Sequence, residues 1–314
     1  MITNLDQSKL VRSILIAISG GQDSVYLIKL IENIRKNFIS GESIKIMYIY
    51  IDHQWRYDSY EQIKHMTNYI KSIKQKISIY QIKDKIISEH RCRINRYHTI
   101  FYHAKQHKYE AIITAHTQTD KIETFLQNLI RGCGIEGATS LTRQGKFNKN
   151  IYFFRPLIGT TREHILWSCK KFCLPIWSDT TNYIYKIPRN RIRLELIPYI
   201  KKYFHITFEK NIIYLLANYS NDNEYIKQNT IRIYLTIINK KYISINRKEI
   251  KKHNLAIQFR IIQLFCFHNF LIYLDYKKLI KVIKSINKNL YTKIQQNIFI
   301  FHIYKNWIYV TLKH

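Results

Sequence analysis

Short apolar runs alternate with helix-compatible stretches along the first two-thirds of the chain. Runs rich in β-branched residues are typical of strands buried in a parallel sheet, and they occupy 13–18, 44–51, 77–82, 111–114 and 154–157. Stretches without breakers that suit helices occupy 25–31, 59–76, 91–107 and 162–172. Strands that alternate with helices predict an α/β fold, here a doubly wound, mostly parallel sheet of about five strands.

The pattern changes after residue 199. Residues 200–220 suit a helix, whereas 231–245 alternates and is rich in β-branched and aromatic residues, which favours strands. An apolar helical run follows at 258–275, and 298–312 is typical of a hairpin that turns at Lys305-Asn306. We therefore predict two domains, 1–199 and a smaller helical or α/β domain over 200–314.

A turn of small polar residues joins the first strand to the first helix: Ser19-Gly20-Gly21-Gln22-Asp23-Ser24. Two glycines allow positive φ and a close approach of a ligand to the backbone, while the helix N-terminus favours an anion. The carboxylate of Asp23 is suited to Mg²⁺ beside phosphate oxygens. The segment lacks the Gly-Lys-Ser/Thr of the Walker A loop. An ordinary strand-to-helix turn is the alternative.

Polar clusters also follow the second and fourth strands. Asp52 and His53 end the second strand, where a helix cap and a surface imidazole are the alternative interpretation. His116, Asp120 and Glu123 have the spacing i, i+4 and i+7, which predicts that they share one face of a helix after the fourth strand. Because ligands bind at the carboxyl ends of parallel strands, these clusters and the glycine turn are expected at one edge of the sheet.

Charge adds a candidate partner. The formal net charge is +30, and residues 200–314 carry 20 basic against 5 acidic side chains. This density indicates a polyanionic partner, most simply RNA or DNA. The alternative is a compositional bias, because abundant Ile, Lys, Asn and Tyr are expected from an AT-rich genome.

The cysteines and the hydropathy exclude several classes of protein. The five cysteines do not form a disulfide framework or a zinc pattern, and Cys169 and Cys173 are expected to be small buried side chains on one helix face. No apolar run reaches the length of a transmembrane helix, and the N-terminus lacks the pattern of a signal peptide. We therefore expect no membrane association.

The Ser19–Ser24 hexapeptide resembles the PP-loop signature of ATP pyrophosphatases, which implies a Rossmann-like domain related to the adenine nucleotide α-hydrolases. The order of the later blocks resembles the tRNA(Ile)-lysidine synthetase family over roughly residues 13–200. The matching residues are Asp52 to Arg56 (with Gln54 and Trp55 as departures), Arg93, Arg96, Tyr97, Ala115, His116, Asp120, Glu123, Thr124, Arg131, Gly132, Gly134, Gly137, Arg155 to Leu157, Asp179, Asn182, Arg189, Asn190 and Arg193.

The resemblance implies that ATP adenylylates the wobble cytidine of a tRNA(Ile) with a CAU anticodon, and that free lysine then displaces AMP. It implies catalytic roles for Asp23, Arg93, His116, Asp120 and Glu123, with His116 and Glu123 orienting lysine or removing its proton. It implies ATP binding by Ser19, Gly20, Gly21, Gln22, Asp23, Ser24, Asp52, His53, Arg93, Arg189 and Arg193. Mg²⁺ would be held by Asp23 and Asp120.

One departure and several alternatives accompany this resemblance. Thr119 stands where the family usually has the first of two aspartates, and a hydroxyl is a weaker metal ligand than a carboxylate. The alternatives are another PP-loop tRNA enzyme such as a thiolase, or a non-catalytic RNA-binding protein on a PP-loop scaffold. Composition fits a protein encoded in a plastid or in a low-GC bacterium, and the resemblance allows a homodimer.

Overall fold

The computed structural model describes residues 11–37, 44–54, 58–82, 89–148, 151–177, 187–288, 291–296 and 298–312. The chain divides into two compact units, Met1–Leu216 and Ala217–His314. The division falls inside the long helix α9 (Phe208–Ile237), whereas the sequence predicts a boundary after residue 199. Because no glycine or proline interrupts α9, the helix carries the chain from one unit into the next.

The first unit contains a six-stranded sheet, and its five parallel strands agree with the predicted α/β fold. The spatial order is β3-β2-β1-β4-β6-β5, with β5 alone antiparallel. The strands are β1 (Ser13–Ile18), β2 (Lys45–Asp52), β3 (Ile77–Gln81), β4 (Ala111–Thr114), β5 (Gln144–Asn148) and β6 (Ile151–Phe154). The sequence did not predict β5, because its Gln, Gly, Lys and Asn residues lack the apolar pattern of a buried strand. The fifth predicted strand, 154–157, ends early, since Pro156 begins a 3₁₀ turn, η1 (Pro156–Gly159).

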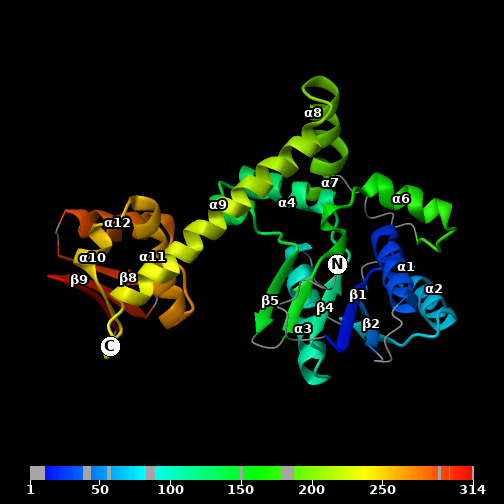
Figure 1. Cartoon of the computed structure of the whole chain (residues 1–314), viewed down its shortest axis with the longest axis horizontal. Helices are drawn as coiled ribbons and strands as arrows, with labels where there is room; N and C mark the ends of the chain where they lie inside the picture. The colour runs from blue at the N-terminus through cyan, green and yellow to red at the C-terminus, as the bar shows by residue number, and fades with distance from the viewer. Residues whose placement is uncertain are drawn as a thin grey trace. The chain divides into compact units, whose positions relative to one another are not determined.

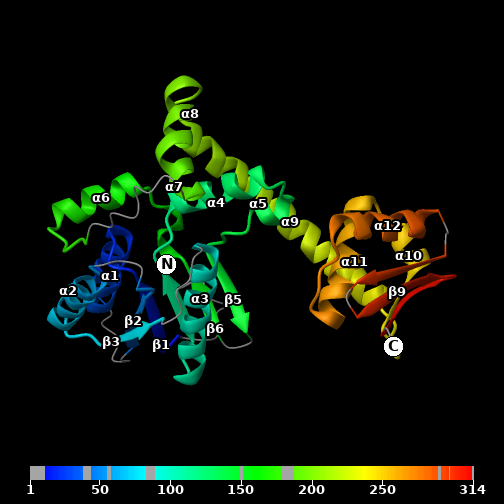
Figure 2. The same cartoon turned by 180° about the vertical axis from the view of Figure 1, so that it is seen from behind.

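Helices cover both faces of this sheet (Figure 1). The helices α1 (Gln22–Asn37), α2 (Ser59–Ser72) and α6 (Arg162–Lys171) pack against one face. The helix α3 (Glu89–Gln106) packs against the other, as the view from behind shows (Figure 2). Neighbouring β1 residues divide accordingly: Ile14 and Ile16 lie in the first core and Leu15 in the second.

The chain reverses its direction of travel across the sheet between β1 and β4. From β1 it proceeds outward to β2 and β3, and then returns to place β4 on the other side of β1. At such a switch point the loops that follow the two strands diverge and leave a crevice at their carboxyl ends. The loop into α1 and the start of α4 (Gln118–Ile130) border this crevice.

The remaining helices of the first unit are short or follow one another closely. A single turn, α5 (Ile135–Ala138), follows α4. Pro188 begins α7 (Pro188–Arg191), as its position in the sequence predicts, and the helix continues through η3 (Ile192–Leu196) into α8 (Ile197–Tyr203).

The second unit is a four-stranded antiparallel sheet with helices packed on it. Its sheet has the order β7-β10-β9-β8, and Phe301, Ile303 and Ile308 pack under Phe265 and Val282 in a shared core. The elements are β7 (Ser244–Asn246), α10 (Arg247–Lys251), α11 (Leu255–Phe270), α12 (Tyr276–Asn287), β8 (Thr292–Gln296), β9 (Phe299–Tyr304) and β10 (Trp307–Leu312). The hairpin predicted at Lys305-Asn306 is confirmed.

Two local predictions are wrong. Residues 231–237 continue α9 rather than form a strand, because Thr230, Tyr234 and Ile237 are buried at helical spacing despite their strand-favouring composition. Cys173 is exposed after the end of α6, with a positive φ of 46°, whereas Cys169 is buried as expected. Among the described helices, none combines the length and the apolar composition that a membrane span requires.

Candidate active site

A cleft of about 1450 Å³ opens at the carboxyl ends of β1, β2 and β4. It brings together most of the residues that the sequence predicts to be functional: Ser19, Gly21, Gln22, Asp23, Ser24, Asp52, His53, Arg93, His116, Asp120, Arg189 and Arg193. Gly20 and Glu123 are not among its lining residues.

The Ser19–Ser24 loop is held in shape by its own hydroxyls and by α2. The Ser19 amide donates to the Ser24 hydroxyl at 2.9 Å, and the two hydroxyls lie 3.0 Å apart. The Gln62 amide donates to the Ser19 carbonyl at 3.1 Å, while Gln62 itself accepts from Tyr50 at 2.9 Å. The loop is therefore preorganised at the N-terminus of α1, a position that favours binding of an anion.

Gly20 has a φ of +80°, and a Cβ at this position would lie 2.9 Å from the amide nitrogen of Gln62. We expect Gly20→Ala to destabilise the protein by about 1–2 kcal/mol, through the left-handed backbone and the displaced Gln62, and to weaken ATP binding. Urea denaturation and the KM for ATP measure the two effects. Gly145→Ala is the control, because no atom lies within 4 Å of its Cβ position; an equal loss in both variants would contradict the argument.

Asp23 lies in the first turn of α1 with one carboxylate oxygen, Oδ1, buried and without a hydrogen-bond partner. Burial raises the pKa of Asp23 to about 6, against the opposing influence of Arg162. A carboxylate that has one buried oxygen without a hydrogen-bond partner, at the N-terminus of a helix beside a glycine loop, is suited to a cation that arrives with an anion.

The end of β2 is shaped by Asp52. Its Oδ1 accepts from the Gln54 amide at 2.8 Å and from the Ser59 hydroxyl at 2.6 Å, which fixes the start of α2. The neighbouring His53 lies 3.4 Å from Arg96, and burial with this guanidinium lowers the pKa of His53 to about 4. The imidazole of His53 is therefore uncharged at neutral pH, and it lines the cleft.

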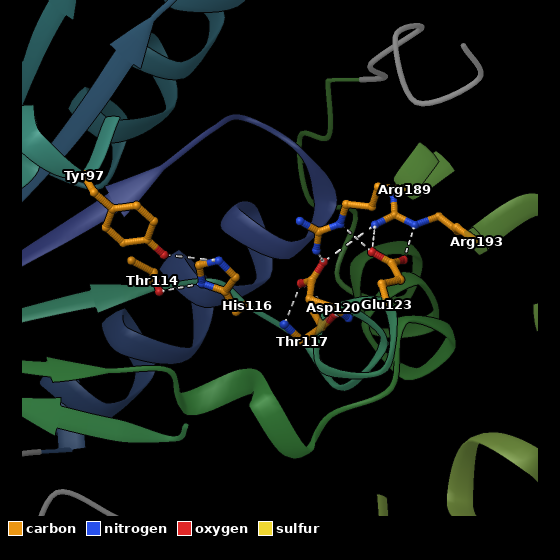
Figure 3. A network of polar contacts seen from close by, with 8 residues as sticks. All are labelled: Tyr97, Thr114, His116, Thr117, Asp120, Glu123, Arg189 and Arg193. Atoms are coloured by element: carbon orange, nitrogen blue, oxygen red, sulfur yellow. Dashed lines mark hydrogen bonds and ion pairs between the residues drawn. The ribbon is translucent and has the colours of Figure 1, made fainter. Parts of the chain in front are cut away.

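His116 lies before α4, not on it, so the predicted shared helix face with Asp120 and Glu123 is wrong. Thr117 is the N-cap of α4, which leaves His116 in the preceding loop (Figure 3). Its Nδ1 is 2.8 Å from the Thr114 hydroxyl and its Nε2 is 3.4 Å from the Tyr97 hydroxyl. Burial, reinforced by nearby arginines and opposed by Asp120, lowers the pKa of His116 to about 3.

Two acidic residues of α4 meet two arginines of the α7–η3 helix (Figure 3). Arg189 donates to Asp120 and to Glu123, each at 2.7 Å. Arg193 donates to the two oxygens of Glu123 at 2.5 and 3.0 Å. Glu123 is fully buried and holds the two arginines, and both arginines line the cleft.

Asp120 also closes the N-terminus of α4. Its Oδ2 accepts from the Thr117 amide at 2.8 Å, and its own amide donates to the Thr117 hydroxyl at 3.4 Å, which together form a capping box. The Thr117 hydroxyl also lies 3.0 Å from Oδ2 and donates to it. Burial alone would raise the pKa of Asp120, but Arg189 and His116 outweigh it and hold this pKa below its usual value. Asp120 is thus ionised, and both of its oxygens are engaged within the protein.

The helix that carries the arginines contains a π-helical segment, η3. Pro198 has no N–H to donate, and directly before it the Ile197 amide bonds to the Ile192 carbonyl, five residues back. Such wide turns recur at functional sites, and this one includes Arg193. The sequence predicted the helix start at Pro188 but not this irregularity.

Several cleft residues were not predicted to be functional. Gln62 supports the glycine loop from within an ordinary amphipathic helix, and Arg162 faces Asp23 from the first residue of α6. Lys201, Lys202 and Lys210 also line the cleft. In the sequence each of these residues is simply a polar residue within a predicted helix, and no motif distinguishes it. The family-matching residues Arg56, Asp179 and Asn182, and the departure Trp55, lie outside the described residues.

Comparison with known families agrees with this geometry. Residues 1–200 match the PP-loop domain family. The curated relative "tRNA(Ile)-lysidine synthase, chloroplastic" of Gracilaria tenuistipitata var. liui is 48% identical over 95% of this chain and 92% of its own length. The "tRNA(Ile)-lysidine synthase" of Nostoc sp. is 33% identical over 80% of this chain and 77% of its own length.

Among solved structures, a U34-tRNA thiolase from Methanococcus maripaludis, containing a [4Fe-4S] cluster, superposes with a TM-score of 0.58. It covers 71% of this chain and 76% of its own, at 15% identity. This likeness shows a common fold, and at this identity it extends no further.

Proposed function

This chain belongs to the tRNA(Ile)-lysidine synthase family of PP-loop enzymes, and from that premise we propose that it ligates free lysine to C2 of the wobble cytidine in a tRNA(Ile) with a CAU anticodon. Its PP-loop domain uses ATP. The observation that carries the proposal is one cleft in which an anion-binding loop faces Arg93, Arg189 and Arg193. That arrangement suits a nucleoside triphosphate together with an RNA substrate.

The first step transfers AMP to the base. The cytosine O2 attacks the α-phosphorus of ATP, and the bond to the β-phosphate breaks to release pyrophosphate. The Ser19–Ser24 loop and the N-terminus of α1 stabilise the leaving pyrophosphate, and Arg189 and Arg193 are held by Glu123 for the charge that develops. In the second step the lysine ε-amine, after losing its proton, attacks C2 and AMP departs.

The geometry assigns different roles to the two residues proposed for orienting lysine or taking its proton. His116 has a pKa of about 3, far below that of a base suited to neutral pH, and both of its ring nitrogens have partners. Glu123 is engaged by two guanidinium groups. We infer that His116 positions the base or the lysine as a neutral imidazole, and that Glu123 positions the arginines.

The residues fit one Mg²⁺ ion bound with the phosphates. The buried, unpartnered Oδ1 of Asp23 is an oxygen ligand at the phosphate loop, whereas Asp120 would have to release a protein contact first. No cluster of three or more metal-ligating side chains occurs within the described ranges, which suits an ion that takes one or two carboxylates, waters and substrate phosphates. Such an ion neutralises phosphate charge.

Incorporation of radiolabelled lysine into the CAU transcript tests the proposal. We expect ATP-dependent labelling that is absent for a C34U transcript and for the initiator tRNA. Pyrophosphate release with another tRNA, without lysine incorporation, would instead indicate a different PP-loop modification. Thiolation is disfavoured because no cysteine is found among the described residues that line the cleft. No pyrophosphate release at all would indicate a binding protein.

We propose that the second unit holds the tRNA on the open face of its sheet. His302 and Tyr309 stack there with centroids 4.9 Å apart, and Tyr304 and Trp307 are exposed beside them. Lys293 pairs with His302 in register across β8 and β9. Exposed aromatic rings and lysines on a sheet are a common means of binding RNA.

Replacing Trp307 and Tyr309 together with alanine should raise the KM for tRNA about 10-fold, with little change in the KM for ATP. Steady-state lysidine formation measures both constants. Tyr225→Ala serves as the control, because the Tyr225 side chain is exposed on α9. If the KM for tRNA were equal in the double variant and the control, the open face of the sheet would not bind the tRNA.

The relatives also bear on compartment and assembly. Relatives named chloroplastic and bacterial relatives place this protein in a plastid or in a bacterial cytoplasm. The resemblance further allows a homodimer, which analytical ultracentrifugation would detect.

A further inference from the structure

Large apolar side chains are exposed where α8 turns into α9. Tyr203, Phe204 and Ile206 are 62%, 73% and 78% exposed, and Tyr199 is exposed beside them. The ring of Tyr199 lies 4.9 Å from that of Tyr203 and 6.0 Å from that of Phe204. We call Tyr199, Tyr203, Phe204 and Ile206 the aromatic ridge. A contiguous apolar patch of this kind on a protein surface marks an interaction site.

The turn beneath the ridge is fixed by its own hydrogen bonds. The amides of Phe204 and His205 both donate to the Ile200 carbonyl at 3.0 Å. The His205 ring accepts from the Thr207 amide at 3.3 Å and lies 2.9 Å from its hydroxyl. Lys201 bonds to Glu209 at 3.0 Å and so ties α8 to α9. The backbone that carries the rings is therefore ordered before any partner binds, which lowers the entropic cost of binding.

Lysines accompany the rings. Lys202 lies over the Tyr203 ring at 4.9 Å, and Lys210 lies over the Tyr214 ring at 5.7 Å. The acidic neighbour Glu209 is already paired with Lys201. Aromatic planes interleaved with unneutralised ammonium groups are complementary to unpaired nucleobases on a phosphate backbone, and less so to the apolar face of a protein.

One member of the ridge, Ile206, lines the cleft, and Lys202, which lies over the ring of Tyr203, lines it too. Pro198, Lys202, Ile206 and Lys210 line the same cleft as Asp23 and His116. An RNA loop whose reactive base enters the cleft would place neighbouring nucleotides at this rim. Since a base must leave its stack to react, its unpaired neighbours need a substitute surface on which to stack.

We propose that the aromatic ridge stacks unpaired bases of the tRNA anticodon loop while the wobble cytidine occupies the cleft; this rests on the proposed function. Tyr203 and Phe204 are the stacking residues, and Lys202 and Lys210 contact the adjoining phosphates. The ridge acts in binding and positioning and takes no part in bond making.

Fluorescence anisotropy with a labelled CAU anticodon stem-loop tests this. Tyr203→Ala combined with Phe204→Ala should weaken binding about 10-fold or more, whereas Tyr203→Phe, which keeps the ring, should retain wild-type affinity. Tyr102→Ala, similarly exposed on α3, is the control. A second stem-loop with abasic loop nucleotides should bind wild type weakly, and the double variant should lose no further affinity for it.

Two results would overturn the inference. One is unchanged affinity in the double variant, which would assign the ridge to another class of partner. The other is an equal loss for normal and abasic loops, which would indicate general disruption. Failure of the wild-type protein to form lysidine would refute the proposed function alone, because the stem-loop measurements do not depend on turnover.

Discussion

Replacing Asp23 with asparagine should reduce lysidine formation by about a thousand-fold while leaving the protein as stable as the wild type or more stable. The reduction follows from losing the anionic oxygen beside the phosphate loop, since electrostatic groups at a developing charge contribute about 10²–10³ in rate. The stability gain follows from removing a carboxylate whose Oδ1 is buried without a hydrogen-bond partner.

The pH dependence of stability shows whether the Asp23 carboxylate raises or lowers the free energy of unfolding. In the folded protein the pKa of Asp23 is raised to about 6 from 3.8, mainly by burial. Between these values the unfolded chain releases its proton first, so the group's contribution to the free energy of unfolding falls as pH rises. Above pH 6 the ionised carboxylate costs about 3 kcal/mol, at about 1.4 kcal/mol for each pH unit separating the two values.

Chemical denaturation at pH 4.5 and pH 7.5 measures this cost. Asp23→Asn should exceed the wild type in free energy of unfolding at pH 7.5 and should approach it at pH 4.5. Asp222→Asn, on the exposed surface of α9, is the control and should change neither stability nor turnover. An Asp23→Asn protein that is less stable than wild type at pH 7.5 would mean that the carboxylate is stabilised by contacts, and would sink the argument for a cation.

The part of the site that could be predicted from sequence is the part fixed by local chemistry. A β-branched run, two glycines and a breaker-free stretch predict β1, the turn and α1, and the structure has β1 at the predicted residues. The parallel arrangement then brings the polar ends of β2 and β4 to the same edge. Each of these inferences needs only neighbouring residues and a general rule of sheet topology.

What could not be predicted depends on contacts between distant residues. Gln62 reaches the Ser19 carbonyl across 43 positions of sequence, and Arg193 reaches Glu123 across 70. His116 shows a second limit: spacing predicts a helix face, but the Thr117 cap decides where the helix begins. A third is α9, where β-branched composition conceals helical spacing of its buried residues.

Glu123→Ala should be the most destabilising single change at the site, costing about 3–5 kcal/mol of the free energy of unfolding. Glu123 is fully buried and bonds to both Arg189 and Arg193, so its removal takes a carboxylate away from two largely buried guanidinium groups, both of which also lie within 4 Å of Asp120. Both arginines line the cleft, and their displacement should also reduce the adenylation rate in whatever fraction remains folded.

A matched control lies on the helix that carries Arg189 and Arg193. Glu195 bonds to Arg191 at 3.0 Å, with both side chains about half exposed, and such surface pairs contribute only about 0.3–0.5 kcal/mol. Urea denaturation of Glu123→Ala and Glu195→Ala therefore compares one interaction type in two environments.

Glu123→Gln separates the positioning role of Glu123 from a role as proton acceptor. The variant keeps an acceptor for one arginine and should fall between wild type and alanine in both stability and adenylation. If it folds normally and adenylates normally but no longer transfers lysine, then Glu123 is the proton acceptor after all, and the positioning role assigned to it here is wrong.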